Sequence, residues 1–512
     1  MHIALFLPKT GRAKALEGPA VARTARNQPR GAAIALGAGA VFPYDGCNAT
    51  RGIRGTMANR MGTDPMGRLL VRFALPVVAG LLISRFYILV DGMFVGQALG
   101  PAGVAATTIA MPFVTLLNAL IMLIGDGGTA VLALRLGAGR RGDAAQVLGN
   151  ALFMLLGASV LLGGTVMLWA DPLLALAGAS GPVLEQAKTY LVITVFGTFA
   201  LGFSLGIDTF LRAAGFPNRT LFVQVLGAVA NIGLDYAFVM VFGWGIVGAA
   251  VATVLGQVVA MAVTMALLFR RDMPFRLRGR DLRPAGPLIG RMALLGMPSF
   301  IVRGSDAALN IVLNALVVGY GASTALGGDD ALAVSGAISR VTQFALVPAI
   351  GIAIGMRPLV GFNFGAGDGV RVRGLVVRAA VAGSACLTVL WAAIEIEPGL
   401  LMSLFGFEGD TAVFACWALR VSLLAMPILM IRITGTNYFQ GIGRAKKAIV
   451  LTFCQQVVFL LPLLVLAPLV LPLVTDATPL ESVFWGMFAA DVASTALVAW
   501  FLACDPGLRV RA

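Results

Sequence analysis

Histidine and charge are scarce in this chain of 512 residues. The only histidine is His2, so histidine general-base and metal chemistry have almost no residue to perform them. No Gly-x-x-x-x-Gly-Lys-Ser/Thr phosphate loop occurs, and an ATP-driven pump would therefore need a separate subunit. No nucleophile–base set or cofactor motif stands out either, which disfavours an enzyme. The cysteines have no paired spacing and predict neither a disulfide framework nor a zinc motif: Cys47, Cys386, Cys416, Cys454 and Cys504.

The low charge is matched by long apolar runs. Charged residues make up 12% of the chain, against about 25% in soluble domains, and the mean hydropathy is +0.91. A helix crosses a bilayer with about 20 mainly apolar residues, and these runs are far longer than a barrel strand. The sequence predicts an all-α integral membrane protein with twelve spans, at 69–95, 104–136, 145–169, 184–213, 220–242, 245–269, 288–319, 331–362, 374–395, 411–438, 448–471 and 482–503.

The net charge of +14 is distributed by loop, which argues against nucleic-acid binding. Basic residues fall in alternate loops: Arg140–Arg141, Arg212 to Arg219, Arg270 to Arg283, Arg371 to Arg373, Arg444 to Lys447 and Arg509 to Arg511. The intervening loops contain none, as in 96–103, 242–245, 321–330 and 475–481. The positive-inside rule places the basic loops in the cytoplasm. We therefore predict a multi-pass protein of the inner (plasma) membrane with both termini cytoplasmic.

Residues 1–60 differ in composition from the rest, with nine basic and two acidic residues and many glycines and alanines. Their apolar stretch at 31–42 is too short to span a membrane and lacks the layout of a signal peptide. We predict that this extension is disordered. Met57 and Met61 are alternative starting points of translation, immediately before the first span.

The chain repeats itself at an offset of 228 residues. Gly137-Ala138-Gly139 recurs as Gly365-Ala366-Gly367, and the glycine turn at 212–215 recurs at 440–443. Six spans precede the basic linker and six follow it, which predicts two pseudo-symmetric six-helix lobes. Such two-lobed designs are typical of secondary transporters, with the substrate path between the lobes. The predicted divisions are an N-lobe at 65–270, a cytoplasmic linker at 271–287, a C-lobe at 288–504 and a tail at 505–512.

Two acids lie inside apolar spans of the first half. Asp91 is in span 1 and Asp235 is in span 5. A carboxylate is costly at the bilayer centre, so its presence there is a functional-site hypothesis by default. Asn231 and Tyr87 each stand four residues before one of these acids and share its helix face. Leu75-Pro76 in span 1 is echoed by Met297-Pro298 in span 7 at an offset of 222 residues. With this offset for Asp91 and 228 for Asp235, the equivalent positions in the second half are apolar, near Leu313 and Leu463.

Motifs along the chain resemble those of the multidrug and toxic compound extrusion (MATE) family. The resemblance covers about 65–500 and rests on the order of these motifs: Pro76 with Asp91-x-x-Phe94-x-Gly96, Arg135-Leu136-Gly137-Ala138-Gly139, Arg212-Ala213-Ala214-Gly215, Asn231-x-x-Leu234-Asp235, Gly245-x-x-Gly248-Ala249-Ala250, Pro358-Leu359-x-Gly361-x-Asn363 and Phe439-Gln440-x-Ile442-Gly443. It implies a substrate and ion site at Asp91, Asn231, Asp235, Tyr190 and Thr253. It is closer to the branch named for DNA-damage-inducible transporters, because helix 10 lacks the acid of a second-lobe cation site.

Helix geometry supports one polar layer. Asp91 lies 19 residues above Arg72, and Asp235 lies 16 residues above Arg219, or roughly 28 and 24 Å at the rise of a helix. Tyr190 and Thr253 reach a comparable layer from the other side. Two adjacent buried acids titrate as a coupled unit and can hold a proton, a sodium ion or part of an organic cation. Sodium would bind at Asp91, Asn231 and Asp235.

The predicted function is secondary antiport, which exports cationic or amphipathic small molecules in exchange for protons or sodium. Pro76 removes a helix hydrogen bond and is a candidate hinge in span 1. We expect a monomer that contacts membrane lipid and needs no ATPase subunit. The alternative is a lipid or lipid-linked oligosaccharide flippase of the same superfamily. A channel is disfavoured, because the scattered polar residues form no continuous file.

Other charges within the spans are open to several interpretations. Asp208 with Arg212 and Arg303 with Asp306 have the spacing of structural helix pairs. Asp126, with Asn118 in the same span, is ambiguous between structure and function. Four arginines line a second-lobe cavity or bind lipid headgroups, and the sequence does not separate these roles: Arg340, Arg357, Arg420 and Arg432.

Overall fold

The computed structural model describes residues 57–176, 181–324 and 326–508, and these residues are almost entirely helical. The first half contains α1 (Met57–Thr63), α2 (Met66–Gly137), α3 (Arg141–Leu176), α4 (Gly181–Phe196), α5 (Thr198–Gly202), the π-helix η1 (Phe203–Ile207), α6 (Asp208–Ala213), α7 (Pro217–Asp235), the π-helix η2 (Tyr236–Val241), α8 (Gly245–Leu268) and the 3₁₀-helix η3 (Gly279–Leu282). The second half contains α9 (Gly286–Gly321), α10 (Gly328–Ala345), α11 (Val347–Gly365), α12 (Gly369–Ile396), α13 (Pro398–Ser403), α14 (Gly409–Leu423), α15 (Met426–Gly441), α16 (Ala445–Phe453), the π-helix η4 (Cys454–Leu460), α17 (Leu461–Val474) and α18 (Pro479–Ala503).

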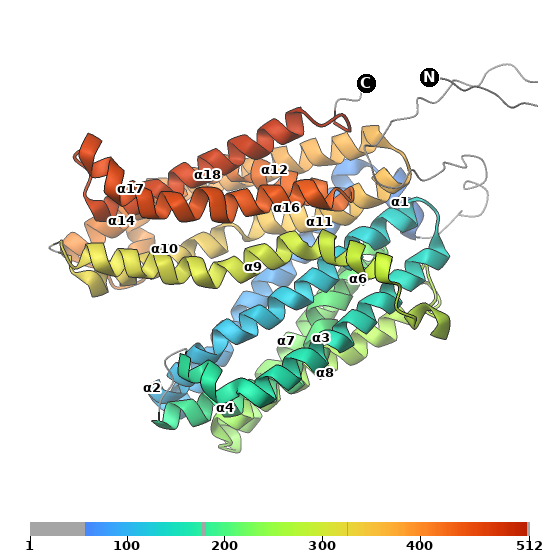
Figure 1. Cartoon of the computed structure of the whole chain (residues 1–512), viewed down its shortest axis with the longest axis horizontal. Coiled ribbons are helices and arrows are strands. Elements are labelled where there is room, and N and C mark those ends of the chain that lie inside the picture. Colours follow the sequence, from blue (N-terminus) through green and yellow to red (C-terminus); the bar gives the residue numbers. More distant parts are fainter. Residues whose placement is uncertain (1–56, 177–180, 325, 509–512) are drawn as a thin grey trace, which may run out of the picture. The chain divides into compact units, whose positions relative to one another are not determined.

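The helices within 52–512 form two bundles. Figure 1 shows α2 to α8, in blue to green, gathered in one bundle and α9 to α18, in yellow to red, in the other. Ten helical stretches among the described residues are long and apolar enough to cross a membrane, or twelve if each of two bent pairs is one span. The long helix α2 contributes two of them, Met66–Leu99 and Ala106–Gly137. The predicted all-helical, two-lobed membrane fold is therefore confirmed.

Three predicted spans are not single straight helices. The span at 331–362 is divided into α10 and α11 at Leu346, two residues before Pro348, which has no backbone N–H to donate. The span at 411–438 bends by 41° between α14 and α15, where Pro427 begins the second helix. The span at 184–213 bends by 56° at Gly197, whose missing side chain leaves room for Val254 of α8. Local proline and glycine chemistry accounts for these departures.

The 228-residue repeat is visible in the backbone. Gly139 and Gly367 end α2 and α11 with φ of 74° and 79°. The residues that follow them repeat a hydrogen bond, from Arg140 N to Arg135 O and from Asp368 N to Asn363 O. The turns at Gly215 and Gly443 match in the same way, with positive φ at both. The two halves therefore stop their helices by the same left-handed glycine cap.

The two bundles contact each other where α2 crosses α9 and α11. A Cβ at Gly127 would lie 1.9 Å from the backbone oxygen of Met292, and a Cβ at Gly296 would lie 1.9 Å from that of Leu123. Glycine is needed here because the backbones approach too closely for a side chain. Similar contacts join Gly355 to Ala74, Gly351 to Val78 and Gly365 to Leu134. All of these positions lie in the half of the helices nearer the basic loops, which we call the basic-loop half.

The segments outside the spans are also anchored. Residues 1–56 lie outside the described residues, but the end of the extension predicted to be disordered forms α1. Asn363 and Arg371 both donate hydrogen bonds to the backbone oxygen of Met61. In the linker, the hydrogen bond from Arg219 holds the pKa of Asp272 below its ordinary value. The basic linker is thus held against the first bundle by the ion pair between Arg219 and Asp272.

Candidate substrate and ion site

The two predicted acids lie on neighbouring helices of the first bundle. Asp91 is in the first span of α2, and Asp235 is the last residue of α7, directly before the π-helix η2. The rings of Phe94 and Tyr236 are 6.3 Å apart, which places α2 beside α7 at this level. Nearby, Val95 packs in one buried cluster with Val239 of η2 and Ala249 of α8. π-helical turns are frequent at functional sites, because the extra residue redirects the side chains that follow.

The carboxyl groups of Asp91 and Asp235 face each other. The two side chains interact directly, at hydrogen-bonding range. Asp235 is fully buried, and among the described residues neither of its carboxyl oxygens has a hydrogen-bond donor. Oxygen Oδ1 of Asp91 is also buried and has no hydrogen-bond donor among the described residues. Two carboxylates can share such a contact only when a proton or another cation lies between them, because both are acceptors.

Three other predicted residues surround this pair. Asn231 is 4% exposed and interacts with Asp235, while its two amide atoms have no hydrogen-bond partner among the described residues. Tyr87 of α2 and Tyr190 of α4 both lie within electrostatic range of the two acids. The structure therefore brings together five of the six predicted site residues around one carboxyl pair.

Thr253 is placed only by the register of its helix. A Cβ at Gly256 of α8 would lie 3.2 Å from the Cα of Asn231, so these two residues are opposite each other. Because α7 and α8 are joined by a short loop and run antiparallel, Thr253 comes near the level of Asp235. The described contacts of its hydroxyl include no hydrogen bond to the other five residues. Pro76, the predicted hinge, is buried within α2 well below the acids.

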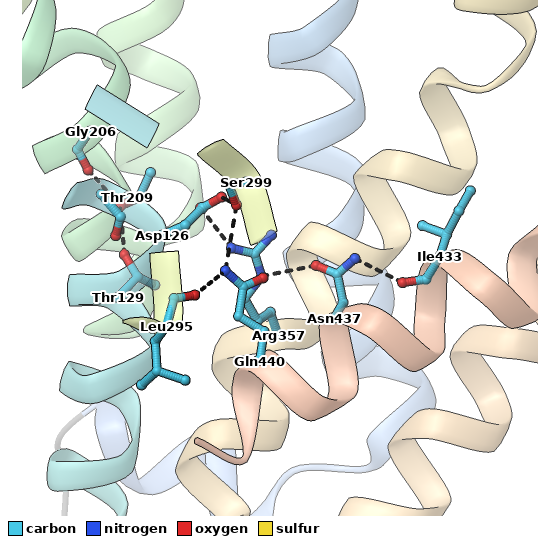
Figure 2. Close-up of polar contacts among 11 residues, drawn as sticks. Asp126, Thr129, Gly206, Thr209, Leu295, Ser299, Arg357, Ile433, Asn437 and Gln440 are labelled. Atoms are coloured by element: carbon cyan, nitrogen blue, oxygen red, sulfur yellow. Dashed lines mark hydrogen bonds and ion pairs between the residues drawn. The ribbon is translucent and has the colours of Figure 1, made fainter. Parts of the chain in front are cut away.

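A second polar cluster links the two bundles, and Figure 2 shows its contacts. Asp126 of α2 forms an ion pair with Arg357 of α11, with 2.7 Å between Oδ1 and Nη1. Ser299 of α9 donates a hydrogen bond of 2.6 Å to the other carboxyl oxygen of Asp126. The sequence left Asp126 ambiguous beside Asn118 and left Arg357 between a cavity and lipid. Their pairing across 231 positions has no local sequence signal.

The remaining charges have different surroundings. Arg432 of α15 pairs with Asp491 of α18 at 3.2 Å, and both are in the second bundle. Arg420 is half exposed and pairs with Glu395 at 3.7 Å, while Arg340 is exposed. The predicted helix pairs Asp208–Arg212 and Arg303–Asp306 interact electrostatically, without an ion pair within 4.0 Å among the described residues.

Two geometric features elsewhere do not coincide with the acids. A cavity of about 350 Å³ between α3 and α4 is lined almost entirely by apolar groups, and it contains none of the six predicted residues. Among the described residues, no group of three or more His, Cys, Asp or Glu side chains could hold a metal ion.

Comparison with known proteins identifies the family. The profile described as MatE matches residues 76–237 and 307–466, one match in each half of the chain. This chain belongs to the MatE family. The multidrug export protein MepA of Staphylococcus haemolyticus is 22% identical over 433 residues, which cover 83% of this chain and 90% of that protein.

Solved structures of MATE transporters have the same fold as this MatE-family chain. A MATE crystal structure in the bent conformation matches with a TM-score of 0.80 and 25% identity, over 87% of this chain and 96% of that one. An outward-facing multidrug resistance MATE transporter of the MOP superfamily matches with a TM-score of 0.78 and 25% identity, over 86% and 96%. The predicted family is confirmed, and the DNA-damage-inducible branch stays a prediction. The MatE-family chain is thus a multi-pass membrane protein of a transporter family.

Proposed function

We propose that this chain is a secondary active antiporter that exports cationic or amphipathic small molecules in exchange for protons or sodium. The observation that carries the proposal is the carboxyl pair of Asp91, which is half-buried, and Asp235, which is fully buried. Neither oxygen of Asp235 nor Oδ1 of Asp91 has a hydrogen-bond donor among the described residues. The family match and the multidrug export proteins among its relatives support the same activity and do not favour the flippase alternative. The protein acts without catalysis, and it works as a monomer with no ATPase subunit.

The pair performs exchange by competition. A proton, a sodium ion or the positive end of a substrate each satisfies the two facing carboxylates, and binding of one excludes the others. Asn231 contributes an amide oxygen to a bound cation, or its N–H group to an ionised carboxylate. Tyr87 and Tyr190 provide phenol hydroxyls at the rim of the same space. Coupling follows because the site is emptied of one cation before it accepts the next.

Export against a gradient requires that the site open to alternate sides. The bundles are joined in the basic-loop half, while Asp91 lies 13 residues, or roughly 20 Å of helix, beyond the last glycine contact of the first span at Val78. We propose that an N-lobe of 65–270 and a C-lobe of 288–504 rock about this contact, with Pro76 as a hinge in α2. Each charge moved through the membrane potential supplies about 2.3 kcal/mol per 100 mV.

Purified protein in proteoliposomes tests this function directly. Uptake of a fluorescent organic cation is measured under an imposed pH gradient and then under an imposed sodium gradient. We expect one gradient to drive transport and Asp91→Asn to abolish it, because a single remaining carboxylate no longer exchanges its ion for the substrate. Asp329→Asn, at an exposed position at the start of α10, is the matched control and retains transport. Transport by Asp91→Asn at the wild-type rate would contradict the proposed site.

A further inference from the structure

The ion pair between Asp126 and Arg357 is the buried charged contact that joins the two bundles in Figure 2. The side chains of Asp126 and Arg357 are 12% and 7% exposed. The guanidinium group of Arg357 is also held within the second bundle, because its Nε donates a hydrogen bond of 2.9 Å to Asn437 of α15. Ser299 completes the shell of Asp126 from α9. One acid of the first bundle is therefore enclosed by donors that all belong to the second.

The 228-residue repeat explains where this contact comes from. Adding 228 to Thr129 and Thr209 gives Arg357 and Asn437, so these two pairs occupy equivalent positions in the two halves. Thr129 and Thr209 are hydrogen-bonded to each other at 2.6 Å, as Arg357 and Asn437 are at 2.9 Å. Each half thus repeats the same polar helix contact. In the second half an arginine replaces a threonine, and its greater length reaches across to α2.

Net stability is a poor explanation for this arrangement. The cost of removing two charges from water largely cancels their attraction, whereas separation of an already buried pair leaves two unpaired charges and is strongly unfavourable. The pair also lies directly beside one of the close backbone contacts between the bundles, at Gly127 and Met292. Separation of the bundles in the basic-loop half must therefore break the ion pair between Asp126 and Arg357. Each of the two charges then needs a new partner.

The first bundle contains such a partner. Arg212 of α6 is 6% exposed and lies within electrostatic range of both Asp126 and Asp208. Its Nε has no hydrogen-bond partner among the described residues. Asp208 meanwhile accepts a hydrogen bond of 3.2 Å from Gln224. Arg212 is therefore positioned to receive Asp126, while Asn437 remains beside Arg357 in the second bundle.

We propose that Asp126 and Arg357 form a latch that holds the basic-loop half closed, and that Asp126 exchanges Arg357 for Arg212 when the bundles part. This inference rests on the proposed alternating access and assigns a gating role to residues outside the carboxyl pair. Arg212 stabilises the open arrangement and Arg357 the closed one. Their removal is consequently expected to shift the equilibrium in opposite directions, which a purely structural role would not produce.

Distances between spin labels test the latch in the ligand-free protein. Labels are placed at Gly142→Cys on α3 and Val370→Cys on α12, two exposed positions near the basic loops, in a background without the native cysteines. Arg357→Gln is expected to raise the ratio of the longer to the shorter distance at least about tenfold. Asp126→Asn removes the partner of both arginines and is expected to change this ratio less than Arg357→Gln does. The double variant is expected to match Asp126→Asn, because Arg357 has no acidic partner in the latch once Asp126 is replaced. Arg212→Gln is expected to lower the ratio.

Two controls keep the result specific. Thr129→Val removes the equivalent neutral contact within the first bundle and is expected to leave the distances unchanged. Asp91→Asn, which tests the proposed function, is expected to leave them unchanged as well, so failure of transport and failure of the latch are distinguishable. Arg357→Lys keeps the charge but loses the Nε bond, and it gives an intermediate shift if Arg357→Gln does not fold. An unchanged distribution in Arg357→Gln, or a shift of Arg212→Gln in the same direction as Arg357→Gln, would overturn the proposal.

Discussion

Asn231 and Asn150 are both buried asparagines, but their side chains have opposite surroundings. Asn150 donates to the backbone oxygens of Gln146 and Arg283 and accepts a hydrogen bond from Ala285 N, which ties α3 to the linker. The amide of Asn231 has no partner among the described residues and lies beside Asp235. A buried polar group without a partner costs free energy, so this contrast supports the proposal that Asn231 binds an ion or substrate, whereas Asn150 stabilises the fold.

This contrast predicts that the same change, from asparagine to leucine, has different effects at the two positions. Asn231→Leu is expected to keep the free energy of unfolding within about 1 kcal/mol of the wild type, because it removes an unpaired polar group. Transport is expected to fall at least about tenfold, or about 1.4 kcal/mol in the barrier. Asn150→Leu is expected to cost about 2 kcal/mol, because it leaves backbone groups unpaired, while its folded fraction still transports. Thermal unfolding and transport rates are measured for both, and a stable, fully active Asn231→Leu would remove this residue from the site.

At the scale of elements, the end of α18 is fastened by a single carboxylate. Asp505 is fully buried and accepts hydrogen bonds from Arg444, from Lys447 at 2.9 Å and from the hydroxyl of Tyr438 at 2.8 Å. Burial alone would raise the pKa of Asp505, but these three donors together hold it below its ordinary value. The carboxylate therefore connects α18 to α15 and to the turn before α16.

The lowered pKa predicts an acid-dependent loss of stability. Above an unfolded pKa of about 3.9 the contribution of Asp505 is complete, and it is lost as the pH falls through the lower folded value. Asp505→Asn is expected to cost about 2 kcal/mol at pH 7. The melting temperatures of the two proteins should converge as the pH falls below about 3.9. A difference that does not change between pH 7 and pH 2.5 would show that Asp505 acts through packing and not through charge.

At the scale of the whole molecule, the basic loops predict an orientation that one native cysteine can report. Cys504 is exposed at the end of α18, and the loop before that helix lies at the opposite end of the span. A variant with Cys504 as its only cysteine is expected to react with a membrane-impermeant thiol reagent only after the cells are opened. The same background with Cys504 replaced and Asp476→Cys, in the exposed opposite loop, is expected to react in intact cells. The reverse pattern would place the termini outside.

Much of the architecture is local and was accessible from sequence. Apolar runs long enough to cross a bilayer determine the spans, and acids within those runs stand out because hydrocarbon cannot solvate them. The 228-residue repeat predicted two equivalent halves, and the matching glycine caps at Gly139 and Gly367 confirm it. The closeness of Asp91 and Asp235 was accessible because the helix rise places both acids at a similar depth in the membrane. Two acids at one level of adjacent helices can interact with each other.

Only the tertiary structure decided which distant side chains meet. Asp126 and Arg357 are 231 positions apart, and nothing in the neighbourhood of either residue specifies the other. Pairing across bundles depends on how α2 crosses α9 and α11, which glycines such as Gly127 and Gly296 permit through backbone contact. A helix pattern specifies a face, but the partner of that face is set by packing. The sequence by itself therefore determined the spans, the repeat and the acidic layer, and the packed structure determined the contact that joins the two bundles.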